Sequence, residues 1–344
     1  GDEAKYYARH MDVVFEAYER RFHMAGHEGE IVKRMPLYLF RNQAEYAHAL
    51  GWLDANIERT DGLFFNQSGH QGLATFTHRK QESLSRTLAT LQHEGFHQFA
   101  YAFVGPDFPI WVNEGIAQYF EDGVVIDGKM YLNVASGDRI DTVQTAVQEG
   151  RIIPFERLVA MSQDVWHRQV MTDRRKAGIA YAQVWSMVFF LVHGDNGRYR
   201  KAFEDYLRYL SEGKDSKHAF KRAFGTSDLS RFQRAWLRGV RDLRAGPVYA
   251  ARARLRFLGQ GMLILREKGE DIPDRLSELR KLLQRYRYRT VEGNERSEVK
   301  LSAMDKSVYS YQTNSGDVRR FRMLEPERDN LLPRITAPGL NPEP

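Results

Sequence analysis

The sequence contains no cysteine, which excludes disulfide bonds and cysteine-ligated metal sites. It also lacks a long hydrophobic run. The longest, residues 184–192, is too short to span a bilayer and includes a serine. Neither charge sign dominates, because 51 Lys and Arg are interspersed with 45 Asp and Glu, and we find no basic arm for nucleic acid. The net charge of +6 indicates an ordinary solvated basic surface. The alternative is a weak preference for acidic partners such as an anionic cell envelope.

The length and composition are those of a soluble globular protein. A chain of 344 residues can bury a substantial core as one large domain or two smaller ones. Hydrophobic residues make up 42% and charged residues 28%, both ordinary values for this class. We therefore expect a protein that does not span a membrane, and the sequence does not indicate its oligomeric state. It begins with Gly1 rather than Met, as expected where a leading segment such as a signal peptide has been removed.

One predicted helix carries two histidines on the same face. His93 and His97 are four positions apart, so both imidazoles can reach one point. Glu94 follows the first histidine and projects beside that point, where it can hold a water molecule without binding a metal. The short pattern H-E-x-x-H by itself also fits two ordinary helix histidines. Apolar residues at helical spacing support the helix: Leu84, Leu88, Leu91, Phe96 and Phe99.

The next motif offers a third ligand. A catalytic zinc needs three protein ligands and an open position for water. Glu114, in the string W-V-N-E-G-I-A, stands seventeen positions after His97, near the start of a second predicted helix over residues 113–122. The predicted ligands of one zinc ion per chain are therefore His93, His97 and Glu114.

Together the two motifs resemble those of the gluzincin clan of zinc peptidases, which includes thermolysin-like enzymes and aminopeptidases with a similar second motif. The resemblance is strong in the motifs and looser over residues 30–210. More closely, the chain resembles an uncharacterised bacterial family of exported gluzincin-like proteins of unknown substrate. The resemblance implies a zinc-dependent hydrolase of peptides or proteins, exported to the periplasm or the cell surface.

The resemblance also implies roles for single residues. Glu94 would take a proton from the attacking water and deliver it to the leaving nitrogen. Tyr181, sixty-seven positions after Glu114, matches the separation of an oxyanion-stabilising Tyr in the aminopeptidase branch, although an ordinary buried aromatic fits equally well. Thermolysin-like enzymes have an Asp four residues after the Glu ligand. Here Gln118 could accept a hydrogen bond from a ligand imidazole without supplying charge, and Asn113 is expected to cap the second helix.

In gluzincins the strand before the zinc helix tends to be the sheet edge along which an extended substrate lies. By resemblance the strand over residues 73–77 would do this, with Leu73, Ala74 and Thr75 as substrate-binding residues. The Gly-rich motif with which aminopeptidases recognise a free N-terminus is missing before the zinc helix. An endopeptidase is therefore favoured over an aminopeptidase.

The predicted fold class is α+β and gluzincin-like, with a small N-terminal mixed sheet whose edge strand precedes the zinc helix. Residues 1–245 form the predicted metallopeptidase domain, as a helix plus sheet over 1–80 and a helical zinc-site lobe over 81–245. In the first part, a helix over 3–24 ends at Gly26 and Gly29, and Asn42 caps a helix through Leu50. The strands are predicted at 35–40, 62–65 and 73–77.

The helical lobe has predicted helices at 154–161, 174–193, 197–210, 215–224 and 228–243, and a hairpin over 124–132 with Asp127-Gly128 as its turn. Gly246-Pro247 marks a predicted boundary. Residues 246–344 are then a small α+β appendage with helices at 249–268 and 273–286 and strands at 299–303, 307–311 and 318–323. Its tail, rich in proline from Pro333 onward, is expected to be loose.

Two other functions remain open. The first is a catalytically silent binding or scaffold protein of the cell envelope, although such a protein has no need for Glu94. The second is a zinc hydrolase of non-peptide amides or esters, which shares the site and differs in the pocket. Cleavage of peptides, inhibited by a metal chelator, separates the favoured peptidase from both.

Overall fold

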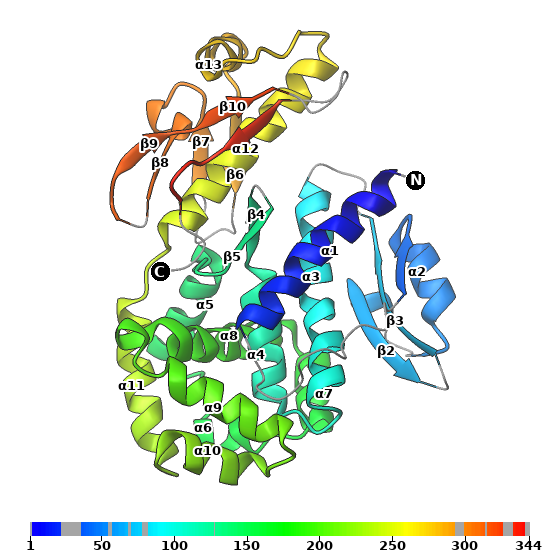
Figure 1. Cartoon of the computed structure of the whole chain (residues 1–344), viewed down its shortest axis with the longest axis vertical. Coiled ribbons are helices and arrows are strands. Elements are labelled where there is room, and N and C mark those ends of the chain that lie inside the picture. The colour runs from blue at the N-terminus through cyan, green and yellow to red at the C-terminus, as the bar shows by residue number, and fades with distance from the viewer. Residues whose placement is uncertain are drawn as a thin grey trace. The chain divides into compact units, whose positions relative to one another are not determined.

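The structure is a computed structural model that describes residues 2–21, 36–53, 57–67, 70–77, 82–126, 128–292, 299–313, 315–325 and 333–340. The chain forms two compact units. Unit 1 comprises Gly1–Gly123 and Thr142–Leu243, and unit 2 comprises Val124–Asp141 and Arg244–Pro344. The elements are mainly helical with several small sheets, which agrees with the predicted α+β class (Figure 1).

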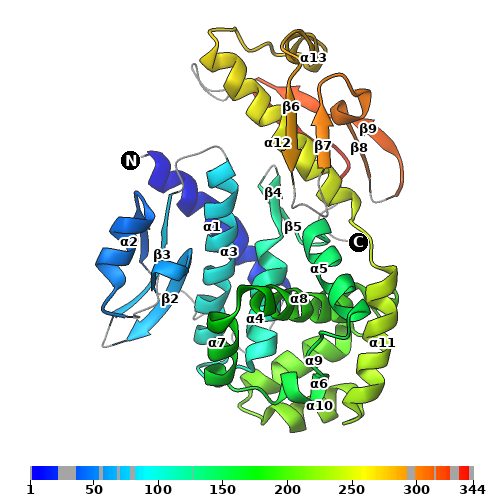
Figure 2. The ribbon, with the colours of Figure 1, turned by 180° about the vertical axis from the view of Figure 1, so that it is seen from behind.

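Unit 1 is organised around the long helix α3 (Glu82–Phe103). Figure 1 shows α3 between a three-stranded sheet on one side and α4 (Ile110–Glu121) and α8 (Arg174–Gly197) on the other, and the view from behind in Figure 2 shows the same order. The remaining elements are α1 (Asp2–Arg21), β1 (Leu37–Phe40), α2 (Gln43–Leu50), η1 (Ile57–Arg59), β2 (Gly62–Gln67), β3 (His70–Phe76), α6 (Phe155–Val159), α7 (Gln163–Thr172), α9 (Arg200–Ser211), α10 (Ser216–Phe224) and α11 (Leu229–Asp242). Helix α5 (Gly137–Gln148) begins in unit 2 and ends in unit 1.

The sheet of unit 1 corrects one prediction. Its strand order is β1-β3-β2, with β1 parallel and β2 antiparallel to β3, so the sheet is mixed as predicted. However, β3 is the central strand and not the edge. Leu73, Ala74 and Thr75 pair with both neighbours and are buried, so no substrate backbone can add to β3 there. Within the described residues, β1 and β2 each pair with β3 alone, and of these two edge strands β2 lies next to α3.

Aromatic packing holds the histidine-bearing helix in place. Tyr18 of α1 contacts Phe96 and Phe99 of α3, and its ring lies 4.5 Å, edge to face, from that of Phe120 in α4. All four side chains are buried. Large aromatic side chains supply most of the apolar area in such a core, so α1, α3 and α4 form one rigid layer behind the histidines.

Helix α8 is the one described helix long and apolar enough to cross a membrane by length and composition. Most of it is buried inside unit 1, where Trp185 and its apolar neighbours have almost no exposed surface. This is the burial pattern of a core helix.

Unit 2 has its own core, built on α12 (Pro247–Glu267). Pro247 occupies the first turn of this helix, where the backbone N–H that proline lacks would have no partner within the helix. Its core includes Ile126 and Tyr131 from segment 124–141, which the predicted division assigned to the first domain. The other junction, between residues 243 and 244, lies close to the predicted boundary. The elements are β4 (Val124–Ile126), β5 (Lys129–Tyr131), α12 (Pro247–Glu267), α13 (Leu276–Arg285), β6 (Arg289–Glu292), β7 (Val299–Ser302), η2 (Lys306–Tyr309), β8 (Ser310–Gln312), β9 (Val318–Arg320), β10 (Arg322–Leu324) and β11 (Arg334–Thr336).

Several predictions for unit 2 were wrong in detail. The strand predicted at 307–311 begins as the helical turn η2, because the Asp305 side chain caps it by accepting from the Ser307 N–H. The run predicted at 318–323 is two strands with different partners, β8 for β9 and β11 for β10. The tail over 333–340 is not loose, since Leu340 is buried and its carbonyl accepts a hydrogen bond from Tyr131.

Four elements of the two units were not predicted: helices α5 and α7 and strands β6 and β11.

Some predicted features lie outside the described residues: the helix stop at Gly26 and Gly29, the first residue of the strand over 35–40, and Asp127 of the predicted turn. Asn42 does cap α2, with its side chain accepting from the Glu45 N–H at 2.9 Å.

Candidate metal centre

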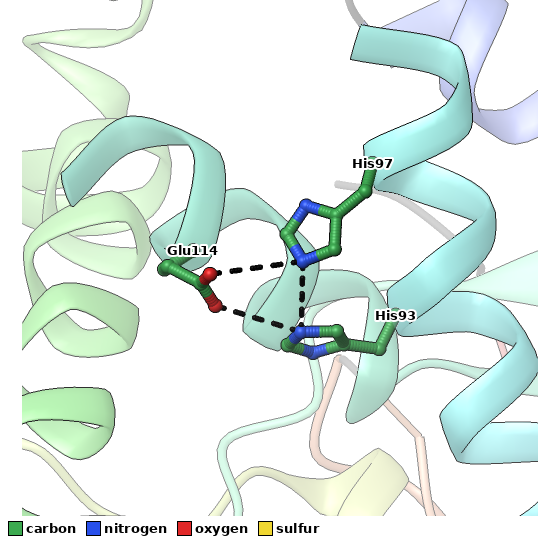
Figure 3. A group of neighbouring side chains, drawn as sticks. All are labelled: His93, His97 and Glu114. Atoms are coloured by element: carbon green, nitrogen blue, oxygen red, sulfur yellow. Dashed lines mark hydrogen bonds and ion pairs between the residues drawn. The ribbon is translucent and has the colours of Figure 1, made fainter. Parts of the chain in front are cut away.

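The two predicted helices bring three candidate ligands to one point. His93 and His97 project from successive turns of α3, and their Nε2 atoms lie 3.1 Å apart (Figure 3). Glu114 of α4 faces both rings, with Oε2 3.5 Å from Nε2 of His93 and Oε1 3.8 Å from Nε2 of His97. One ligand atom from each residue lies within 4.8 Å of the others, so the three can hold a metal ion.

The hydrogen bonds behind the rings prepare both imidazoles for a cation. Nδ1 of His93 lies 2.9 Å from Oε2 of Glu121, and Nδ1 of His97 lies 3.0 Å from Oδ1 of Asn113. Each oxygen accepts a hydrogen bond, which keeps the proton on Nδ1 and leaves the lone pair on Nε2. Two lone pairs that face each other repel unless a cation or a proton lies between them.

The charges around the site favour a cation in the same way. Burial by itself would lower the pKa of the His93 imidazole, but the adjacent carboxylates of Glu114, Glu121 and Glu94 raise it well above its usual value. Burial would raise the pKa of Glu114, yet His97 and His93 lower it below the ordinary range. Oε2 of Glu114 is also buried without a hydrogen-bond partner. The site therefore presents negative charge and one orphaned oxygen to the point where the Nε2 atoms meet.

Helix α4 supplies the residues behind the ligands, and three predictions about them were wrong. The helix begins at Ile110 after Pro109, so Asn113 lies one turn inside it and does not cap it. Gln118 lies beside His93, but the atom 3.2 Å from Nδ1 is its amide nitrogen Nε2, a donor, and not the amide oxygen that was predicted to accept a hydrogen bond. The sequence also predicted that no negative charge would stand behind the ligand imidazoles. Glu121 supplies such a charge behind His93.

Sequence reasoning missed Glu121, although a signal was present. It stands seven positions after Glu114 on the same helix, and residues seven apart share a helix face. The gluzincin pattern directs attention to the position four residues after the ligand, which is Gln118 here. In this chain the carboxylate that pairs with the His93 imidazole therefore comes from a later turn of α4.

Glu94 is held in place by the edge strand. Its Oε2 accepts a hydrogen bond of 2.9 Å from the Phe64 N–H of β2. Close approach of β2 to α3 requires glycine at position 62, because a Cβ there would lie 2.5 Å from Cγ2 of Thr90 and 3.1 Å from Cγ of Glu94. Glu94 and the histidines line the same cleft of about 360 Å³.

Tyr181 lies in the wall of that cleft, on α8. Its ring meets Trp166 of α7 edge to face, with the centroids 5.3 Å apart. Burial and the charge of Glu114 raise its pKa well above the usual value, with further contributions from Glu94 and Glu121. The phenol therefore keeps its proton and remains a hydrogen-bond donor.

A second glycine brings α8 close to α4. A Cβ at Gly115 would lie 2.7 Å from the carbonyl oxygen of Val184, so only glycine allows the two backbones to approach this closely. The glycine in the N-E-G string thus sets the spacing between the helix of Glu114 and the helix of Tyr181. Helix α7, which the sequence analysis did not predict, adds Gln163 and His167 to the lining of the cleft.

The structure defines an α+β protein whose first unit contains a candidate metal centre of two histidines and one glutamate. A protein-family model described as "Protein of unknown function (DUF1570)" matches residues 87–216, a span that includes His93, His97, Glu114 and Tyr181. The description names neither a gluzincin nor a metallopeptidase. No curated protein and no solved structure matches the chain.

Proposed function

We propose that the protein is a zinc-dependent hydrolase that cleaves peptide bonds, with Glu94 as general base and acid. The observation that carries this proposal is the convergence of His93, His97 and Glu114 on one point in a cleft that also contains the Glu94 carboxylate. A protein that only stored or bound a metal would not need an unliganded carboxylate beside it.

The donor set and its spacing fit zinc. Two imidazoles and one carboxylate are a common ligand set for catalytic zinc. Zn–N and Zn–O bonds of 2.0–2.1 Å in a tetrahedron separate the ligand atoms by about 3.3 Å. The observed separations of 3.1, 3.5 and 3.8 Å need only small side-chain adjustments to reach that value. When bound, zinc supplies Lewis-acid chemistry, polarising a carbonyl oxygen and making a water molecule a stronger acid.

The chain's own residues supply the remaining steps. Glu94, oriented by the Phe64 N–H, can remove the proton from the attacking water and carry it to the leaving nitrogen. Tyr181 can donate a hydrogen bond to the carbonyl oxygen as negative charge develops on it. Asn113 and Glu121 hold the two imidazoles in the orientation that directs both Nε2 atoms at the metal.

The edge strand β2 supports an extended peptide as substrate. Gly62, Leu63 and Phe64 line the cleft, and in the part of the chain that the structure describes β2 pairs with β3 alone. An extended chain can therefore lie along β2 and form backbone hydrogen bonds beside the metal. The sequence predicted this role for residues 73–75 of β3, and we now propose it for the neighbouring strand β2.

The test is cleavage of unstructured protein and peptide substrates by the purified chain, with zinc content measured by elemental analysis. We expect about one zinc per chain, and proteolysis that o-phenanthroline abolishes and added zinc restores. Cleavage of esters but not peptides would favour a non-peptide hydrolase. Zinc binding without any hydrolysis would contradict the proposal and favour a binding protein.

A separate prediction concerns the carboxylate behind His93. Glu121→Gln keeps a hydrogen-bond acceptor but removes the charge, so we expect zinc affinity to fall by about 10- to 100-fold. The affinity is measured by competition with a chromogenic chelator. Glu204→Gln, an exposed carboxylate of α9 outside the cleft, is the matched control. Equal affinities for the two variants would remove Glu121 from the metal centre.

A further inference from the structure

A buried hydrogen-bond donor beside the cleft has no partner. Trp166 of α7 is only 3% exposed, and its indole N–H makes no hydrogen bond within the described residues. The side chain does not line the cleft, although Gln163 and His167 of the same helix do. An unpaired buried N–H destabilises the folded state, so such a group is rare in native proteins and needs an explanation.

The acceptor that the structure places against Trp166 is the Tyr181 hydroxyl. The two rings meet edge to face, with centroids 5.3 Å apart and planes at 85°. Burial raises the pKa of the Tyr181 phenol, but the Trp166 side chain acts in the opposite direction, as a hydrogen-bond donor to the phenol oxygen does. The pair stops short of the geometry of a formed hydrogen bond. A small rotation of either ring would complete the bond.

The backbones that carry the two rings are held by their own hydrogen bonds. The Ser162 side chain caps α7, and the Ser162 carbonyl accepts a hydrogen bond of 3.0 Å from the Trp166 backbone N–H. On α8, the buried Gln183 amide accepts from the Ile153 N–H at 2.8 Å and donates to the Ile153 carbonyl at 2.7 Å. The freedom that remains is in the side-chain torsions and the hydroxyl proton of Tyr181. The Trp166 N–H is therefore placed to set them.

A donor behind the phenol changes what the phenol can do in front of it. Within the described residues the Tyr181 hydroxyl has no other hydrogen bond, so its proton can point in several directions. When the Trp166 N–H occupies a lone pair of the oxygen, the hydroxyl proton turns away from the indole, toward the cleft that Tyr181 lines. The same bond polarises the O–H and strengthens the hydrogen bond that it donates.

We propose that the Trp166 indole N–H donates a hydrogen bond to the Tyr181 hydroxyl oxygen and thereby directs the hydroxyl proton into the cleft, which makes Trp166 a positioning residue for the oxyanion donor. The hydrogen bond is a property of the folded chain and needs no substrate. Its effect on catalysis rests on the proposed function, in which Tyr181 stabilises the developing oxyanion. The alternative is that Trp166 only fills space beside α8.

Nuclear magnetic resonance of the purified protein with zinc added tests the hydrogen bond without requiring turnover. Labelling tryptophan with ¹⁵N at the indole gives one N–H signal for each of the five tryptophans, and Trp166→Phe identifies that of Trp166. Tyr181→Phe keeps the ring but removes the acceptor, so the Trp166 indole proton signal should move upfield. Tyr199→Phe removes a hydroxyl that does not line the cleft and should leave that signal in place. An unmoved signal in the Tyr181→Phe protein overturns the proposal.

The effect on catalysis is measured by a double-mutant cycle. Trp166→Phe keeps an aromatic ring beside Tyr181 and should lower kcat by about threefold to tenfold with KM unchanged, the size of one hydrogen bond. In the Tyr181→Phe background the same substitution should have no further effect on kcat, because it acts through the missing hydroxyl. The matched control is Trp236→Phe, which removes a buried indole donor to Ser186 away from the lining of the cleft. It should lower the melting temperature and leave kcat unchanged.

Two kinetic results would reduce Trp166 to a packing residue: an equal loss of kcat in both backgrounds, or a kcat that Trp166→Phe leaves unchanged. Should Trp166→Phe not fold, a spectrum in which Tyr181→Phe moves none of the five signals still overturns the proposal. A moved signal in a protein that hydrolyses no peptide contradicts the proposed function and leaves the hydrogen bond standing. Hydrolysis with an unmoved signal contradicts the hydrogen bond and leaves the proposed function standing.

Discussion

Glu94→Gln should reduce kcat by on the order of 10²- to 10⁴-fold while the zinc content stays at about one per chain. The amide keeps the size of the side chain but cannot take a proton from water. Because Glu94 lies beside the three ligands and is not one of them, its loss should spare the metal. The measurements are peptide hydrolysis and elemental analysis on the same preparation.

Glu204→Gln serves as the control for this prediction, because it removes an exposed carboxylate of α9 that does not line the cleft of the candidate metal centre. It should leave kcat and zinc content unchanged. Loss of zinc from the Glu94→Gln variant would mean that Glu94 is a ligand. Full activity in that variant would remove it from proton transfer.

Tyr181→Phe should lower kcat by about 10²- to 10³-fold with little change in KM or melting temperature, if the hydroxyl stabilises the developing oxyanion. The substitution keeps the ring that meets Trp166 edge to face. It removes only the hydroxyl donor, whose pKa is raised by burial and by the nearby carboxylates so that it stays protonated. Steady-state kinetics and thermal unfolding of the two proteins provide the comparison.

The matched control is Tyr199→Phe, which removes the hydroxyl of the tyrosine that precedes α9 and does not line the cleft. Its kinetics should not change. An unchanged kcat for Tyr181→Phe would leave Tyr181 as the buried aromatic residue that the sequence allowed equally well.

Local elements could be predicted where a periodic pattern and a cap coincide. The apolar spacing around His93 predicts α3, and Asn42 predicts the start of α2. Other predictions failed where contacts between residues far apart in the sequence determine the structure. Strand β1 pairs with β3 across more than thirty residues, which moves the edge of the sheet to β2. Helix α7 is a different case, because a local signal was present and was not used: the Ser162 side chain caps the helix by accepting from the Val165 N–H.

The sequence by itself determined the candidate ligand set. A four-residue spacing on a helix brings His93 and His97 to one face whatever surrounds them, and the second motif supplies Glu114. Only the tertiary structure decided what stands behind and beside these candidate ligands: the Glu121 carboxylate and the edge strand that orients Glu94. The physical reason is that the helical repeat acts between neighbours in the chain, whereas these contacts depend on how β2, α4 and α8 pack around α3.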